Sequence, residues 1–135
     1  MRSKAAEAGI DITVDSAGIG AWHIGQLPDR RMRQCAKERG YDLTHRARQV
    51  SEEDFEHFDI IMGMDDQNIS DLKRIAPSPE AEGRIRLMSD YLTRHAGQRS
   101  IPDPYYGDER DFEFALDLIE DAAGGIIERI KRGMI

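Results

Sequence analysis

An aspartate between two prolines is the feature of this sequence best suited to positioned acid–base chemistry. Asp103 lies in Pro102-Asp-Pro-Tyr-Tyr-Gly107. Each proline fixes its own backbone torsion and pushes the preceding residue toward extended geometry, so the carboxyl group is displayed from a stiff segment. Such a carboxyl group can donate a proton to a leaving oxygen. The aromatic rings of Tyr105 and Tyr106 could surround a flat substrate. The spacing alone favours a simpler alternative, a proline-rich turn before a helix.

Two polar segments near the N-terminus are further candidates. Ser16 follows a short apolar stretch, where its hydroxyl could hydrogen-bond to a neighbouring loop or an anion; a turn that closes a strand is the simpler interpretation. Trp22 lies in the loop Gly20-Ala-Trp-His-Ile-Gly25. Its side chain either contacts a ligand or covers the hydrophobic core. His23 beside it could titrate near neutral pH, although most loop histidines are only solvated.

The single cysteine is predicted to pack in the core. Met32, Cys35 and Ala36 share one face of a predicted helix, whereas a nucleophilic cysteine needs an electropositive and partly exposed setting. One cysteine also excludes an internal disulfide and a cysteine-rich zinc site.

The remaining histidines give no ligand pattern. His45, in His45-Arg-Ala-Arg-Gln-Val50, could anchor a neighbouring loop through a ring nitrogen, but a surface histidine is the simpler interpretation. His57 and His95 lie among charged residues without the spacing of metal ligands. The sequence therefore predicts neither a metal nor another cofactor.

Helices that alternate with short strands must position these residues. The alternation predicts an α/β protein, a three-layer α/β/α sandwich with a short, mostly parallel sheet, formed by residues 1–135 as a single domain. Ligands of such folds bind at the carboxyl ends of the strands. The predicted helices cover residues 1–9, 28–40, 65–76 and 110–132, and the predicted strands cover residues 12–14, 58–62 and 84–88.

Composition limits the classes of partner. The chain has 135 residues, 39% of them hydrophobic, and no apolar segment long enough to span a bilayer, so we expect a soluble, cytoplasmic protein without a membrane partner. A net charge of −7 argues against a nucleic-acid partner, because phosphate backbones require a dense basic face. An anionic substrate must therefore meet a local positive site.

The motifs together resemble the low-molecular-weight protein-tyrosine phosphatases. The resemblance runs along the whole chain in the expected order, and Asp103-Pro-Tyr-Tyr-Gly107 before a long helix is its most specific signal. The other matching segments are Val14–Gly18, Gly20–Gly25, His45–Val50 and Phe58–Asn68.

The resemblance implies a role for each matching residue. Asp103 would protonate the phenolic leaving group and then activate the water that hydrolyses a cysteinyl-phosphate. Ser16 and His45 would hydrogen-bond to the phosphate-binding loop and hold its shape. The implied substrate is a phosphotyrosine protein or a small aryl or acyl phosphate.

The aromatic residues would bind the substrate ring. Trp22 and Tyr105 would flank the phosphotyrosine, Tyr106 would lie beside them, and His23 would lie on the specificity rim. Asp65 and Asn68 fall in a segment near the same site, without assigned roles.

The sequence departs from the family at the nucleophile. The family has an N-terminal Cys-X5-Arg loop between its first strand and first helix, and these 135 residues contain no such motif. The start at Met1 resembles the second half of that helix, so we expect a chain truncated at its N-terminus, without the first strand, and inactive as written. The alternatives are a non-catalytic fragment and a partner-binding pseudophosphatase. Arsenate reduction would need additional cysteines.

Overall fold

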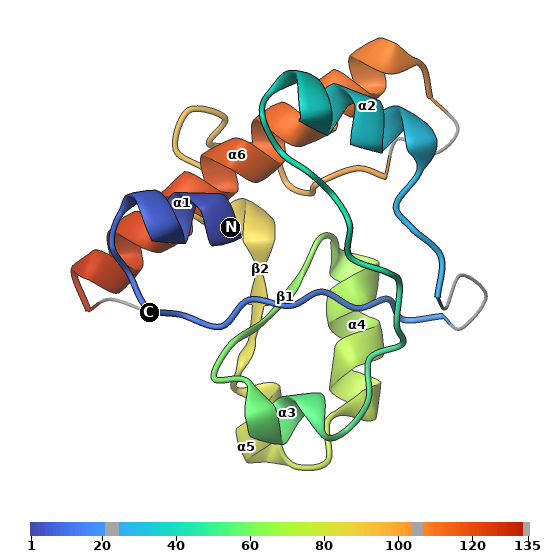
Figure 1. Cartoon of the computed structure of the whole chain (residues 1–135). Coiled ribbons are helices and arrows are strands. Elements are labelled where there is room, and N and C mark those ends of the chain that lie inside the picture. Colours follow the sequence, from blue (N-terminus) through green and yellow to red (C-terminus); the bar gives the residue numbers. More distant parts are fainter. Residues whose placement is uncertain (21–24, 104–106, 134–135) are drawn as a thin grey trace.

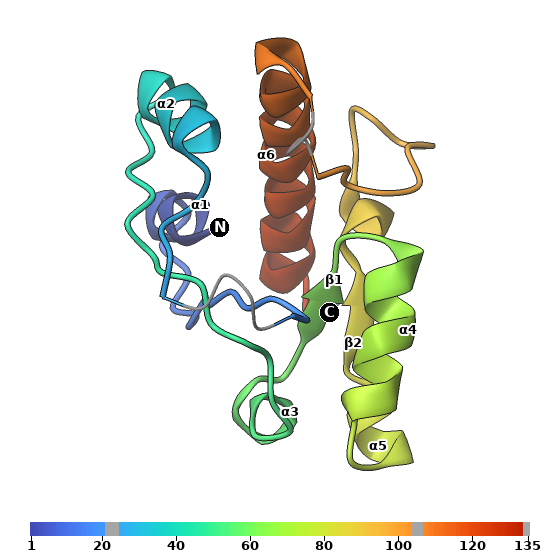
Figure 2. The ribbon, with the colours of Figure 1, turned by 90° about the vertical axis from the view of Figure 1, so that its right-hand side faces the viewer.

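Two helical layers enclose a small parallel sheet in the computed structural model, which describes residues 1–20, 25–103 and 107–133. The helices α1, α2 and α6 lie on one side of the strands, and α4 and α5 lie on the other (Figure 1; Figure 2). The expected three-layer α/β arrangement is confirmed. The helices are α1 (Arg2–Glu7), α2 (Arg30–Glu38), α3 (Asp54–His57), α4 (Asp66–Ile75), α5 (Pro79–Glu82) and α6 (Glu109–Lys131), with a 3-10 turn η1 (Met88–Tyr91).

The sheet consists of two parallel strands. In the described chain, β1 (Ile61–Gly63) pairs with β2 (Ile85–Leu87), and Ile61 lies opposite Ile85. The connection between them runs through α4 and α5, as a parallel pair requires. The strand expected at residues 84–88 is confirmed, whereas the strand expected at residues 58–62 begins later, at Ile61.

The strand expected at residues 12–14 is wrong as a regular strand. The side chains of Ile10, Ile12 and Val14 are half-buried and the intervening ones are exposed, which is the alternation of a strand. No ladder forms along this segment within the described ranges, and the Val14 carbonyl instead accepts hydrogen bonds from Nε and Nη2 of Arg2, at 2.9 and 2.6 Å. Alternation therefore identified the buried face but not the pairing.

Helix α6 is the longest element and contributes more residues to the core than any other described element. Asp108 caps it, accepting a hydrogen bond from the backbone N–H of Asp111, whose side chain accepts one from the N–H of Asp108 in return. Its buried face contacts η1 at one end and α2 at the other. Phe112, Leu116 and Ile126 are among the buried residues of this face. Within the described ranges, no helix combines the length and apolar character needed to cross a bilayer.

One glycine allows α6 to approach η1. An ideal Cβ on Gly125 would lie 1.9 Å from the carbonyl oxygen of Tyr91, whereas a Cβ on Gly124 would meet no atom within 4 Å. Close packing against η1 therefore involves Gly125 and not Gly124.

Candidate active site

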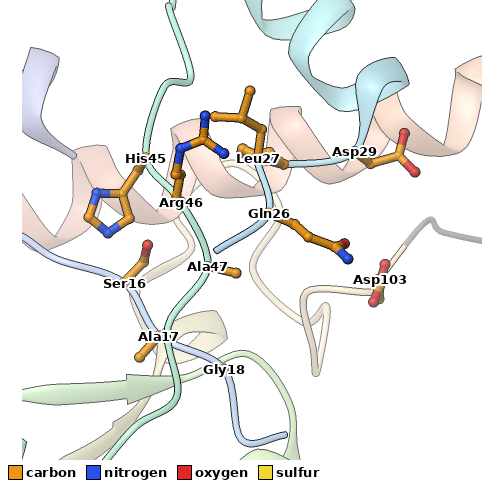
Figure 3. Close-up of a pocket in the computed structure, with 11 residues that line it drawn as sticks. Ser16, Ala17, Gly18, Gln26, Leu27, Asp29, His45, Arg46, Ala47 and Asp103 are labelled. Atoms are coloured by element: carbon orange, nitrogen blue, oxygen red, sulfur yellow. The ribbon is translucent and has the colours of Figure 1, made fainter. Parts of the chain in front are cut away.

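Three of the predicted site residues line one hollow. Ser16, His45 and Asp103 come from separate segments and surround a space of about 500 Å³. Figure 3 shows Ser16 and His45 on one side and Asp103 on the other. The remaining lining comes mainly from residues 26–29 and 46–47. The hollow thus places a carboxyl group across from a hydroxyl and an imidazole.

Two extended segments form the Ser16 and His45 wall. The backbone N–H of Gly18 donates to the carbonyl of Arg48 at 2.8 Å, and the N–H of Val50 donates to the carbonyl of Gly18 at 2.9 Å. This makes a single parallel bridge between Gly18 and Gln49. The bridge fixes the two segments side by side although they are far apart in the sequence.

The carboxylate of Asp15 connects the same segments through side chains. Its Oδ1 lies 2.7 Å from Nε2 of His45, and its Oδ2 accepts a hydrogen bond from Nε of Arg48 at 3.1 Å. Desolvation alone would raise the pKa of Asp15, but the backbone N–H of Ser16 and the charge of Arg48 hold it below its usual value. His45 is therefore oriented by a charged neighbour.

Arg48 extends this connection to the helix behind the wall. Its Nη1 and Nη2 donate to both carboxylate oxygens of Asp54, at 3.0 and 2.9 Å. Asp54 also accepts a hydrogen bond from the N–H of Ser51 at 2.9 Å. Arg48 therefore connects the Ser16 and His45 wall to the first turn of α3. The bidentate contact with Arg48 lowers the pKa of Asp54.

The loop before α2 closes another side of the hollow. The N–H of Gly25 donates to the carbonyl of Ala47, and the N–H of Ala47 donates to the carbonyl of Gln26, each at 2.7 Å. Asp29 ends the loop as the N-cap of α2, with its side chain accepting from the N–H of Arg31 at 2.8 Å.

Asp103 is carried by a segment that is attached on both sides. Two residues earlier, the N–H of buried Ile101 donates to the carbonyl of Met64, at the end of β1, at 2.8 Å. Five residues later, Asp108 caps α6. The carboxyl group therefore stands beyond the carboxyl end of β1, where ligands of parallel sheets bind.

A buried carboxylate fixes the beginning of the same segment. Asp121, in α6, accepts hydrogen bonds from the consecutive backbone N–H groups of Thr93, Arg94 and His95, and from the Thr93 hydroxyl at 2.5 Å. Its side chain is 1% exposed. Burial alone would raise the pKa of Asp121, but these donors lower it to about 2.

Asp65 and Asn68 shape the turn after β1 but do not line the hollow. The Asp65 side chain accepts from the N–H of Asn68 at 2.7 Å as the N-cap of α4. The Asn68 side chain accepts from the N–H of Met64 at 3.0 Å. They therefore hold the segment to which Ile101 binds.

Cys35 lies in the core, as predicted. It is 3% exposed and packs with Ala36, Phe112 and Leu116. Burial and the neighbouring carboxylate of Glu113 raise the pKa of this thiol to about 11. A thiol held in this state is a poor nucleophile.

Four predicted substrate-binding residues lie outside the described ranges. They are Trp22, His23, Tyr105 and Tyr106. Of the described residues that flank them, Gly25 donates its N–H to the carbonyl of Ala47, and the Gly107 carbonyl accepts a hydrogen bond from Arg31 of α2.

Sequence reasoning missed the charged residues behind the wall. Asp15 and Arg48 were noticed only as neighbours of Ser16 and His45, and Asp54 not at all. Their pairing spans long stretches of chain, so no local spacing reveals it. The sequence features that could have pointed to this pairing are the acidic Asp15 at the end of an alternating apolar stretch and the arginines at positions 46 and 48.

Among the described residues, one group of side chains has the spacing of possible metal ligands. Glu38, Glu109 and Glu113 bring their carboxylate oxygens within 4.8 Å of one another. Glu113 already forms an ion pair with Arg39, which competes with a cation. This cluster is also separate from the hollow.

Comparison with known proteins gives one consistent result. The family model "Low molecular weight phosphotyrosine protein phosphatase" matches residues 1–134. A putative low molecular weight protein-tyrosine-phosphatase of Synechocystis is 39% identical, over 100% of this chain and 87% of its own length. The Gallus gallus low molecular weight phosphotyrosine protein phosphatase is 42% identical, over 86% of this chain and 73% of its own length.

Solved structures agree with the sequence comparisons. A protein tyrosine phosphatase from Entamoeba histolytica superposes with a TM-score of 0.94 at 33% identity, covering 99% of this chain and 86% of that one. YfkJ from Bacillus subtilis superposes with a TM-score of 0.88 at 34% identity, covering 99% and 84%. The chain therefore belongs to the low molecular weight phosphotyrosine protein phosphatase family.

Proposed function

We propose that this domain takes part in the hydrolysis of phosphotyrosine monoesters, with Asp103 as the general acid and base. The observation that supports the proposal is the shared hollow: the structure brings Asp103 opposite Ser16 and His45, which the family resemblance assigns to support of a phosphate-binding loop. Two residues before Asp103, the N–H of buried Ile101 donates to the carbonyl of Met64 at the end of β1, which anchors the chain on this side of the carboxyl group.

The proposed chemistry has two steps. A cysteine thiolate attacks phosphorus, the bond to the phenolic oxygen breaks, and Asp103 gives its proton to that oxygen. Asp103, now ionised, removes a proton from water as the water attacks phosphorus and the bond to sulfur breaks. The products are a phenol and inorganic phosphate, and both the thiolate and protonated Asp103 are regenerated.

The nucleophile of this scheme is not Cys35. That thiol is buried, its pKa is raised, and its neighbours Glu109 and Glu113 are acidic. The 135 residues contain no Cys-X5-Arg sequence, so we propose that they do not turn over substrate by themselves. The cysteine and the phosphate-binding arginine must come from residues other than these.

The substrate side of the proposal rests on the family resemblance. We propose that Trp22 and Tyr105 flank the phosphotyrosine ring, with Tyr106 beside them and His23 on the rim. Ser16 and His45 hold the phosphate-binding loop. Small aryl or acyl phosphates are the simplest alternative substrates. We also propose that residues 1–135 form a single domain.

The test is a chimera that joins the N-terminal Cys-X5-Arg segment of an active family member to these residues. We expect it to hydrolyse para-nitrophenyl phosphate, while the 135-residue chain stays at background. Asp103→Asn in the chimera should lower kcat by about 10²–10⁴-fold, and most for substrates with a poor leaving group. Cys35→Ala should leave the activity unchanged.

Two results would refute the proposal. One is an active chimera that keeps its kcat after Asp103→Asn. The other is turnover by the 135-residue chain that disappears with Cys35→Ala, because this would make Cys35 the nucleophile.

A partner-binding pseudophosphatase is the second candidate. It is favoured by the absence of a Cys-X5-Arg motif from the sequence. Under this alternative the hollow would bind a phosphorylated partner without cleaving it.

A cytoplasmic location is part of both proposals, and fractionation of cells that express a tagged chain tests it.

A further inference from the structure

Positive charge is concentrated beside the hollow. Residues 25–48 contain seven Lys and Arg residues against three Asp and Glu residues, although the whole chain has a net charge of −7. This stretch includes the loop before α2, α2 itself and the segment that carries His45. The local charge is therefore opposite to that of the molecule.

Backbone carbonyls of the loop before α2 hold two of these arginines. Nη1 of Arg46 donates to the carbonyl of Gly25 at 2.9 Å, and Nε of Arg33 donates to the carbonyl of Pro28 at 3.0 Å. Figure 3 shows Arg46 together with Leu27, which belongs to the loop before α2, among the residues that line the hollow. Because carbonyl oxygens carry no formal charge, these contacts fix the guanidinium groups without neutralising them.

Two carboxylates on the same side of the hollow as these arginines are already paired. Asp29 forms an ion pair with Arg31 at 3.3 Å, and Asp15 is bound by Arg48 and His45. In contrast, Arg30, Arg33 and Arg46 form no ion pair with a carboxylate of the described residues. We call these three residues the basic rim.

We propose that the basic rim binds acidic side chains adjacent to the phosphorylated tyrosine of a protein substrate, so that acidic phosphopeptides are the preferred substrate class. The inference rests on the proposed function, because it uses the same hollow. Carboxylates on either side of the tyrosine would lie against guanidinium groups that no described carboxylate neutralises, and guanidinium groups bind carboxylates well. The net negative charge of the rest of the chain would repel such a peptide from other surfaces.

Peptides without a phosphate group separate this inference from catalysis. The probes are the heptapeptide Glu-Glu-Glu-Tyr-Glu-Glu-Glu and its counterpart with glutamine in place of glutamate. Titration of the isotope-labelled 135-residue chain, followed by amide chemical shifts in NMR, gives the affinity and the residues affected. We expect the acidic peptide to bind about tenfold more tightly than the glutamine peptide, with shifts confined to residues 25–33 and 45–48. This preference should disappear at about 1 M salt, where charge is screened over about 3 Å.

Charge-reversal variants identify the residues responsible. Arg30→Glu with Arg46→Glu should lower the affinity for the acidic peptide about tenfold. The matched control is Arg74→Glu with Arg132→Glu, which changes the net charge equally at two exposed arginines of α4 and of the end of α6. We expect the control pair to keep most of the affinity. Unchanged amide shifts outside residues 25–48 will show that each variant is folded.

Two results would overturn the proposal. One is equal affinity for the two peptides at low salt. The other is an equal loss of affinity in the rim pair and the control pair, which would mean that net charge alone attracts the peptide. Neither result depends on phosphatase activity, so failure of the basic rim is distinguishable from failure of the proposed function.

Discussion

Replacing Asp121 with asparagine should destabilise the protein in a manner that depends on pH. The carboxylate accepts hydrogen bonds from three consecutive backbone N–H groups and from a hydroxyl, at 2.5 to 3.1 Å. An asparagine side chain has one acceptor oxygen and would turn its own NH2 group toward some of these donors. The substitution therefore leaves some of the part-buried N–H groups of residues 93–95 without their acceptor.

The shift in pKa gives the size of the effect. The pKa of Asp121 is lowered from 3.8 to about 2 in the folded protein. One pKa unit corresponds to about 1.4 kcal/mol, so the ionised form contributes about 2 kcal/mol to folding at pH 7. Because the folded pKa is depressed, this contribution is fully present above the unfolded pKa and is lost as the pH falls through the folded pKa. About half of it remains near pH 3.

Urea unfolding of the wild type and Asp121→Asn, measured between pH 7 and pH 2, tests this reasoning. The free energy of unfolding should differ by about 2 kcal/mol at pH 7, and the difference should shrink steadily below pH 4. The control is Asp117→Asn on the same helix, where the carboxylate is 50% exposed and pairs with Arg39. We expect the control to lose less than about 1 kcal/mol. A loss in Asp121→Asn that is the same at every pH would show that ionisation of this carboxylate is not what stabilises the loop.

Two other predictions concern the core. Gly125→Ala should lower the free energy of unfolding by about 1–3 kcal/mol, because its Cβ would overlap the Tyr91 carbonyl, whereas Gly124→Ala should raise it by up to about 1 kcal/mol through helix propensity; equal effects in urea unfolding would contradict the close contact. Cys35, whose pKa is raised to about 11, should react with iodoacetamide at pH 8 at least about 100-fold more slowly in the native chain than in urea. Rapid labelling of the folded chain would show that the thiol is accessible.

The helices were the part of the fold most accessible from the sequence. The apolar period of α6, the proline and aspartate before α2, and the proline after α4 each mark a helix within a few residues of its observed bounds. These signals are local, because a helix forms its hydrogen bonds within one segment. The short α3 and α5 escaped prediction, since four residues are too few to show a period.

Strands and charge pairs could be predicted only in part. The pattern at Ile10, Ile12 and Val14 records which side is buried, but pairing depends on another segment, and there Arg2 takes the Val14 carbonyl instead. In the same way, the sequence suggested His45 as a site residue but could not show that Asp15 orients it. Both omissions concern contacts between residues that are distant along the chain.

The attachments of the Asp103 segment have a consequence for engineering. Its upstream end binds Asp121 and its downstream end is capped at Asp108, so both ends belong to one rigid helix. The stretch between them has fixed ends and is held at two further points, where Ile101 donates to the Met64 carbonyl and the Arg99 carbonyl accepts from the Ser89 hydroxyl. Residues 96–100 could therefore be exchanged for a segment of another length while the scaffold stays the same, and each doubling of the loop would cost only about 0.6 kcal/mol. Because Ile101 stays bound to Met64, the position of Asp103 would be insulated from the length of this exchanged segment.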